Sequence, residues 1–117
     1  MKLSDLDPAT LTQSAEVNKI IATEWVGWRP SLFDYWNPTG NATHAGEARR
    51  KAYYFVVICT DRPPSRIIVT IRFNGCLYLY SEECLLSEVN NDKAKAKAES
   101  IATSRAIVGA LQGRVKS

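Results

Sequence analysis

The sequence is poor in the residue types that build most catalytic sites. It contains a single histidine, His44, and only three cysteines. A Ser-His-Asp or Cys-His arrangement would have to use His44, and no G-x-S-x-G or comparable motif is present. A G-x-G-x-x-G motif and a phosphate-binding loop are missing as well. We therefore expect a protein that is not an enzyme, with no catalytic residues and no cofactor.

The cysteines are too few and too scattered to organise the fold. An odd number of cysteines without a C-x-x-C pair argues against the disulfide framework of a small secreted protein. With one histidine and no two cysteines at ligand spacing, we expect no metal site either. We interpret Cys59, Cys76 and Cys84 as reduced side chains that act mainly as small hydrophobes.

Long apolar runs are also absent, since none approaches the ~20 residues that span a bilayer. The N-terminal segment 1–8 lacks the apolar core of a signal peptide and carries two aspartates. We therefore expect a cytoplasmic protein that does not contact a membrane.

The composition is that of a single globular domain, residues 1–117. Apolar residues make up 45% and charged residues 23% of the chain, so disorder is not expected. The net charge of +3 is mild. Its basic clusters, 49–51 and the lysines of 93–97, have acidic residues close by. We interpret them as solvated surface in preference to a nucleic-acid footprint.

The first part of the chain predicts a helix. Asp7 and Pro8 are typical of an N-cap and a first helical residue. Apolar residues then recur at helical spacing at Val17, Ile20, Ile21, Trp25 and Trp28. Gly27 is expected to end the helix in a left-handed conformation. We favour core packing over a binding role for both tryptophans.

Residues 29–50 are the least regular part of the sequence and predict an aromatic, turn-rich loop. The segment Asn37 to Asn41 is rich in turn-forming residues, and apolar side chains including Tyr35 and Trp36 precede it. A segment of this length without periodicity is often functional. Its aromatic residues either close one end of the core or are displayed at the surface.

Strand patterns follow at 52–60, 66–73 and 76–80. The first is apolar at both alternating sets of positions, which predicts a strand covered on both faces. Asn74-Gly75 is the strongest two-residue hairpin signal and sets the register of the next two strands. It places Phe73 opposite Cys76, Ile71 opposite Tyr78 and Val69 opposite Tyr80, and on the other face Arg72 opposite Leu77 and Thr70 opposite Leu79.

These two faces predict different environments. The face of Val69 and Ile71 is uniformly apolar or aromatic, so we expect the helices to pack on it. The other face combines Leu77 and Leu79 with Arg72. It is too apolar for an ordinary solvated face and too polar for a full core, so either another part of the chain or a partner should cover it.

After a connection over 82–91, a final helix is predicted from Asp92 to about Leu111. Its stripe is rich in small residues, comprising Ala94, Ala98, Ile101, Ala102, Val108 and Gly109. Arg105 falls within this stripe, where it should extend to solvent, meet a carboxylate or face a ligand, and we prefer the first two. Residues 113–117 are expected to form a flexible tail.

Two segments resemble a known family. "IIATEWVGW" (Ile20 to Trp28) resembles the end of the N-terminal helix in small phage-encoded proteins of the phage ABA-sandwich domain type. "SRAIVGAL" (Ser104 to Leu111) is similar to their alanine-rich closing helix. The chain departs from that family at 37–50, where the family has an apolar helix-like segment. The resemblance implies a phage or prophage origin and assigns no activity.

The overall prediction is an α+β domain with an N-terminal helix, a three-stranded antiparallel sheet and a C-terminal helix packed on one sheet face. We expect a phage-encoded accessory protein that binds a host protein or protein complex. Inhibition of a host defence complex, as by an anti-CRISPR protein, is one such role. The expected contact residues are Tyr35, Trp36, Arg49, Arg50, Arg72 and Leu77.

Two alternatives stay open. A small nucleic-acid or nucleotide binder would use Arg62, Arg66 and Arg72 with nearby aromatic side chains. A structural homodimer would instead associate through the second sheet face.

Overall fold

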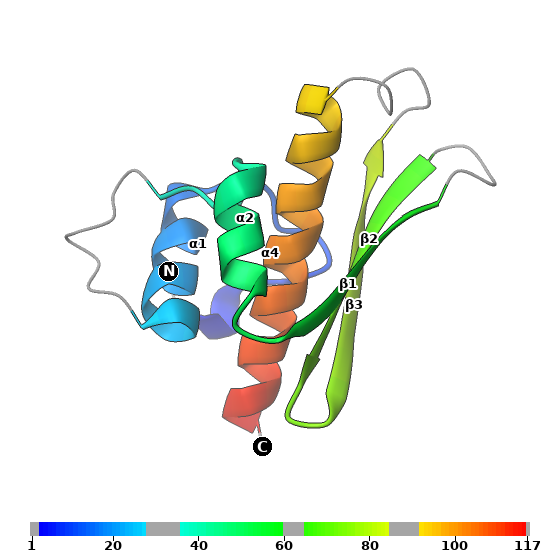
Figure 1. Ribbon diagram of the computed structural model, residues 1–117. Helices are drawn as coiled ribbons and strands as arrows, with labels where there is room; N and C mark the ends of the chain where they lie inside the picture. The colour runs from blue at the N-terminus through cyan, green and yellow to red at the C-terminus, as the bar shows by residue number, and fades with distance from the viewer. Residues whose placement is uncertain (1–2, 28–35, 60–64, 85–91, 117) are drawn as a thin grey trace.

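The computed structural model describes residues 3–27, 36–59, 65–84 and 92–116. It confirms the α+β prediction, with N-terminal helices, a three-stranded antiparallel sheet and a C-terminal helix on one face of the sheet. Figure 1 shows these parts as layers, with helix α4 (Asp92–Lys116) between the sheet and the N-terminal helices α1 and α2.

The N-terminal helix begins later than predicted. A 3-10 turn, η1 (Leu3–Asp5), comes first, and α1 (Ala15–Ile20) starts after Ser14, whose Oγ accepts a hydrogen bond from the Val17 N–H. Asp7 caps only a local turn, through a 3.0 Å bond from the Ala9 N–H to its Oδ1. The prediction of a helix start at Asp7-Pro8 was therefore wrong.

The helix continues as the π-helix η2 (Ile21–Val26) and stops at Gly27. Gly27 has φ of 89°, which confirms the predicted left-handed end. Trp25 packs against the core as expected: its Nε1 donates to the Ala48 carbonyl at 2.8 Å, and its ring lies 5.2 Å from that of Phe73. Trp28 lies outside the described residues.

A second helix, α2 (Ala42–Arg49), occupies part of the segment that we predicted as irregular. The side chain of Asn41 caps it by accepting a hydrogen bond from the His44 N–H at 3.1 Å. Its buried residues are two alanines, Ala45 and Ala48, and Arg49, a set that carries almost no hydrophobic periodicity. The turn-forming residues of 37–41 therefore led to the prediction of a loop, although Asn41 among them caps the start of a helix.

The sheet has the order β1-β2-β3, built from β1 (Tyr53–Cys59), β2 (Ser65–Phe73) and β3 (Cys76–Cys84). All five predicted β2–β3 pairs are confirmed. Asn74 and Gly75 have φ of 52° and 78°, the positive values that this two-residue hairpin requires. β3 is longer than predicted, because it continues through Glu82 to Cys84.

Helix α4 is the centre of the molecule. It packs on β2 and β3 on one side and contacts α2 and η2 on the other, and every residue from Ser100 to Leu111 is buried. The predicted single apolar stripe therefore describes only part of the buried surface of α4. The helix also runs to Lys116, so the tail expected from residue 113 is helical up to that point.

Two glycines let α4 approach the sheet closely. A Cβ on Gly109 would lie 2.7 Å from Tyr80 Cε2, and one on Gly113 would lie even closer to Tyr78 Oη. The glycines are four residues apart on one helix face, and the two tyrosines are two residues apart on one strand face. Each glycine of α4 therefore lies against one tyrosine ring of β3, Gly109 against Tyr80 and Gly113 against Tyr78.

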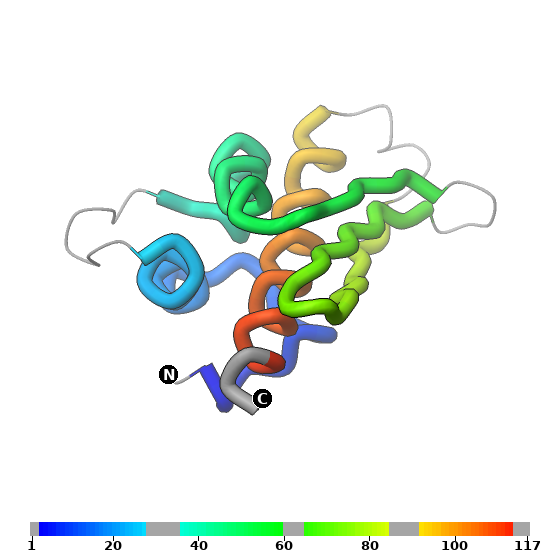
Figure 2. Tube along the Cα trace, turned by 60° about the horizontal axis from the view of Figure 1, so that its bottom comes forward, coloured from blue at the N-terminus to red at the C-terminus, as the bar shows by residue number. Residues whose placement is uncertain are grey.

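Strand β1 differs most from its prediction. It lies at one margin of the sheet, as Figure 2 shows, and α4 packs on β2 and β3 beyond it. Six of its seven side chains, Tyr53 to Ile58, are between 37% and 69% exposed. The prediction that this strand is covered on both faces was wrong, since the described helices cover the middle and the opposite margin of the sheet.

Candidate functional site

The face of the sheet turned away from α4 is the candidate site, and we call it the open face. The pairing registers bring alternate residues of all three strands together on it. These residues are Tyr53, Phe55, Val57 and Cys59 of β1, Arg66, Ile68, Thr70 and Arg72 of β2, and Leu77, Leu79, Ser81 and Glu83 of β3.

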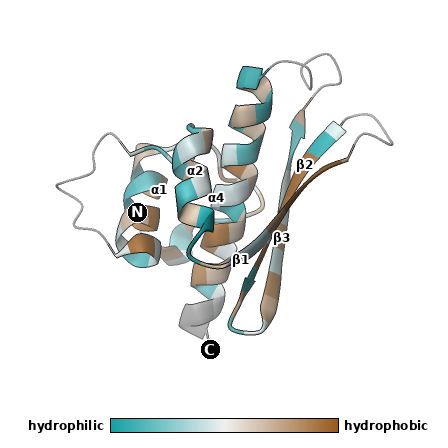
Figure 3. Cartoon of the chain, viewed as in Figure 1, coloured by the Kyte–Doolittle hydropathy of each residue, from teal (hydrophilic) through white to brown (hydrophobic). Residues whose placement is uncertain are grey.

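Large apolar side chains are strongly exposed on this face. The exposed fractions are 69% for Tyr53, 57% for Phe55, 54% for Val57, 67% for Leu77 and 61% for Leu79. Figure 3 shows the apolar colouring that extends along β1. On the opposite face the apolar side chains are buried. Ile67, Val69 and Ile71 of the central strand are at most 3% exposed beneath α4.

Charged residues flank this apolar surface along β2. Arg66 donates to Glu83 Oε1 at 2.9 Å and to Ser81 Oγ at 3.0 Å, and the two ion-paired side chains are about half exposed. At the other end of the strand, Arg72 is exposed and pairs across the sheet with Tyr53 and Leu77. Among the described residues no carboxylate forms an ion pair with Arg72.

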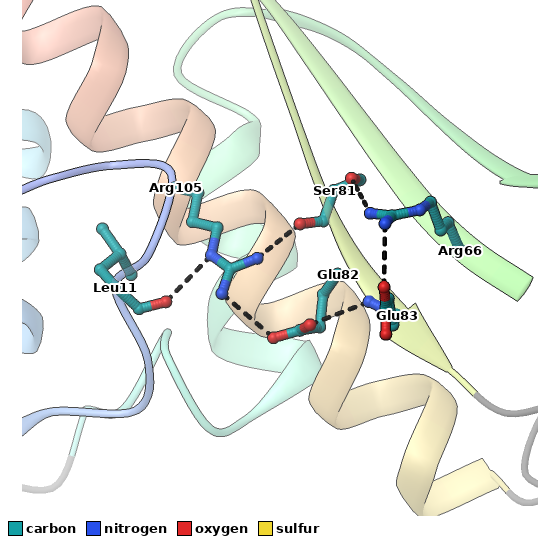
Figure 4. Close-up of polar contacts among 6 residues, drawn as sticks. All are labelled: Leu11, Arg66, Ser81, Glu82, Glu83 and Arg105. Carbon is teal, nitrogen blue, oxygen red and sulfur yellow. Dashed lines mark hydrogen bonds and ion pairs between the residues drawn. The ribbon is translucent and has the colours of Figure 1, made fainter. Parts of the chain in front are cut away.

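A second arginine on the covered side makes a different kind of contact. Figure 4 shows Arg105 of α4 directed at Glu82, while the neighbouring Glu83 turns to Arg66. Arg105 Nη2 lies 3.2 Å from Glu82 Oε2, and Arg105 Nε donates to the Leu11 carbonyl at 2.9 Å. Arg105 thus meets a carboxylate, as we preferred, and joins β3, α4 and the N-terminal segment.

The structure divides the predicted contact residues. Arg72 and Leu77 lie together on the open face, and Arg66 from the nucleic-acid alternative lies there too. Arg50 is exposed after α2 and is not part of this face. Tyr35 and Arg62 lie outside the described residues.

Trp36 and Arg49 were expected to contact a partner, but both are buried. Trp36 is 4% exposed, and its Nε1 donates to Glu47 Oε2 at 3.2 Å. Arg49 is 8% exposed, and its guanidinium lies 2.7 Å from Glu99 Oε1 and donates to Thr103 Oγ1 at 2.8 Å. Each therefore fixes α2 within the fold instead of facing a partner.

Sequence reasoning missed the four β1 members of the open face, Tyr53, Phe55, Val57 and Cys59. Continuous apolarity was interpreted as burial on both faces. An edge strand with an exposed binding surface can have the same continuous apolar sequence. Pairing with Arg72 and Thr70 was the missing information, because it places these side chains beside an arginine on the open face.

Other features of the described residues are less suited to binding. A hollow of about 240 Å³ lies between the end of β3 and α4, where Glu82, Glu83 and Lys97 are among its lining residues. No group of three histidine, cysteine, aspartate or glutamate side chains in the described ranges could hold a metal ion. Within those ranges, no helix combines the length and apolar composition needed to cross a membrane.

Comparison with protein-family models, with curated proteins and with solved structures returned no match for this chain. The resemblance to phage ABA-sandwich proteins therefore stays a prediction.

Proposed function

We propose that this protein acts by binding another protein through the open face. The observation that carries the proposal is the exposure of five large apolar side chains on one face of a regular sheet. An aromatic side chain presents roughly 200 Å² when fully exposed, so these five offer on the order of 500 Å². That is near the upper end of the largest apolar patches on monomeric proteins, which are often functional.

The form of the face supports a protein partner. The strands hold the side chains in fixed positions, so little conformational entropy is lost when a partner packs on them. Leu77, Leu79 and Phe55 would supply the desolvated centre of such an interface. Arg72 and Arg66 lie beside them and would belong to the polar margin that surrounds such a centre.

The phage resemblance extends this proposal to the kind of partner. A small phage protein that binds a host protein, and so blocks a host defence complex, would use a surface of this kind. This extension depends on the resemblance, whereas protein binding depends on the open face.

A single-stranded nucleic acid is a second candidate, favoured by one specific observation. Tyr53 and Phe55 are exposed on the face that carries Arg72, and exposed aromatic rings on a sheet next to arginine can stack bases. Tyr78 and Tyr80 lie on the face opposite Arg72, as the hairpin register predicted, so the rings beside Arg72 are those of Tyr53 and Phe55. We rank it second because Arg66 is already ion-paired and the β3 side of the face is aliphatic.

The test is a capture experiment from host bacterial lysate with wild-type protein and two matched variants. Leu79→Lys adds one charge at the centre of the open face, where 61% exposure makes it compatible with folding. Ala15→Lys adds the same charge at an exposed position of α1, beyond α4 from the sheet. Captures are run at low and high salt, with and without nuclease.

The proposal predicts a protein that is retained at high salt and after nuclease treatment, captured equally by wild type and Ala15→Lys, and lost with Leu79→Lys. Recovery of nucleic acid that disappears with salt would favour the second candidate, because phosphate contacts release counterions. Equal capture by all three proteins would contradict a role for the open face.

A further inference from the structure

We propose that the outer edge of β1 pairs with the β1 of a second copy, forming a continuous six-stranded antiparallel sheet. This edge is a different surface from the open face, and pairing through it is independent of the proposed function. β1 is at the margin of the sheet and is hydrogen-bonded to β2 on one side. No strand among the described residues pairs with its other side, which therefore presents the row of backbone groups that an added strand requires.

β1 lacks the features that normally prevent edge pairing. Edge strands are commonly protected by charged side chains, proline or a β-bulge. The strand Tyr53–Cys59, YYFVVIC, contains no charge and no proline. Its pairing with β2 is one-to-one over all seven residues, so the described strand has no bulge. A bare edge of this kind is suited to pairing.

The order of residues in β1 favours a second copy as the occupant. The first three residues are aromatic, the centre is Val56, and the last three are Val57, Ile58 and Cys59. An antiparallel pair related by a twofold axis at Val56 places Phe55 opposite the second copy's Val57 and Tyr54 opposite its Ile58. Pairs of aromatic and β-branched residues are among the favourable cross-strand pairs. The strand is thus complementary to itself in the antiparallel direction.

Charge agrees with this occupant. Although the chain carries a net charge of +3, no like charges would meet between the two β1 strands.

The proposed pairing leaves the open face free. The strands of both copies would continue one sheet, so Tyr53, Phe55, Leu77 and Leu79 of each copy would lie on the same side. Edge pairing would therefore present two copies of the open face as one wider surface. A face-to-face dimer, by contrast, would cover it.

Residue 56 gives a test of both the edge and its register. In the proposed pair Val56 lies opposite itself, so Val56→Lys places two lysines directly opposite each other, and Val56→Asp places two aspartates opposite each other. Like charges in that position destabilise a strand pair. Mixing the two variants would place lysine opposite aspartate. Because Val56 is 37% exposed on an edge strand, the isolated fold should accept either residue.

The measurement is solution mass by light scattering at roughly 100 µM chain, well above the micromolar range of a modest dimer. Wild type should have twice the 13.0 kDa of the chain, Val56→Lys and Val56→Asp alone should have the single-chain mass, and their equimolar mixture should return to the double mass. Leu79→Lys should remain a dimer. Circular dichroism of each variant confirms that it is folded.

Three results would overturn the proposal. One is a wild-type protein with the mass of one chain. The second is a dimer that Leu79→Lys dissociates and Val56→Lys does not, which would assign association to the open face. The third is a mixture of folded variants that stays monomeric, which would contradict the register. Loss of lysate capture by Leu79→Lys is independent of all three, so this proposal and the proposed function can fail separately.

Discussion

On the covered face of the sheet Ile71 is fully buried. On the open face Leu77, which pairs across the strands with Arg72, the residue after Ile71, is 67% exposed. Both faces are apolar at their centre, but α4 covers only one of them. Apolar character therefore does not by itself identify a core. On the covered face it stabilises the fold, and on the open face it remains available for binding.

The largest difference between the two faces is expected when one apolar residue on each is truncated. Ile71→Ala should lower the free energy of unfolding by about 3–4 kcal/mol, because it leaves a cavity in a closed site. Leu79→Ala should change it by only about 0.5 kcal/mol, since its side chain is already in water. Urea denaturation of both variants measures the difference. Equal losses would mean that the open face is also part of the core.

The ion pairs of Arg105 and Arg66 should also differ in their contribution to stability. Arg105→Ala should cost about 3 kcal/mol, because it leaves Glu82 and the Leu11 carbonyl without their buried partner. Arg66→Ala should cost less than about 1 kcal/mol, because Arg66 and Glu83 are about half exposed. The same urea titration compares them, and a larger loss for Arg66→Ala would contradict the assignment of faces.

A smaller effect is expected where α4 approaches the covered face. Gly109→Ala should destabilise the fold by about 1–3 kcal/mol, because the added Cβ overlaps the Tyr80 ring. Gly46→Ala in α2 is the matched control. Its Cβ would meet only Arg49 Nη2, at 3.6 Å, so alanine should stabilise the helix by up to about 1 kcal/mol. Thermal unfolding of the two variants should therefore shift in opposite directions.

The smallest effect concerns ionisation beneath α4. Burial raises the pKa of Tyr78 above its usual 10.0, and Cys76 adds to the rise. The folded state therefore favours the protonated phenol. Its contribution to stability is complete below pH 10 and is lost as the pH rises through the raised value. Wild type should lose stability in that alkaline range relative to Tyr78→Phe, and parallel pH profiles of unfolding would contradict this.

Much of the fold could be predicted because local signals determine it. Asn74-Gly75 fixed the β2–β3 register, and Gly27 marked a helix end, since each requires a backbone conformation that few residues adopt. The start of α1 was missed because Asp7 and Ser14 are both good caps, and the hydrogen bonds alone select Ser14. Helix α2 was missed because alanines packed on α4 need no apolar periodicity.

The open face was only half predicted, for a physical reason. The hairpin placed Arg72, Leu77 and Leu79 on one face, but the position of β1 depends on long-range pairing that no local pattern encodes. Trp36 and Arg49 were predicted at the surface for a related reason. Their burial depends on helix α2, which was not predicted. A strand with two apolar faces is compatible with the centre of a sheet and with a bare edge, and only the tertiary structure distinguishes the two.

Hydroxyl-radical footprinting of the isolated protein and of the protein bound to its captured partner tests most directly whether the open face is the binding surface. We expect strong modification of Tyr53, Phe55, Leu77 and Leu79 in the isolated protein and protection of these residues in the complex, while Val69 and Ile71 stay protected in both states. An open face that is protected in the isolated protein, or equally modified in both states, would contradict its assignment as the binding surface.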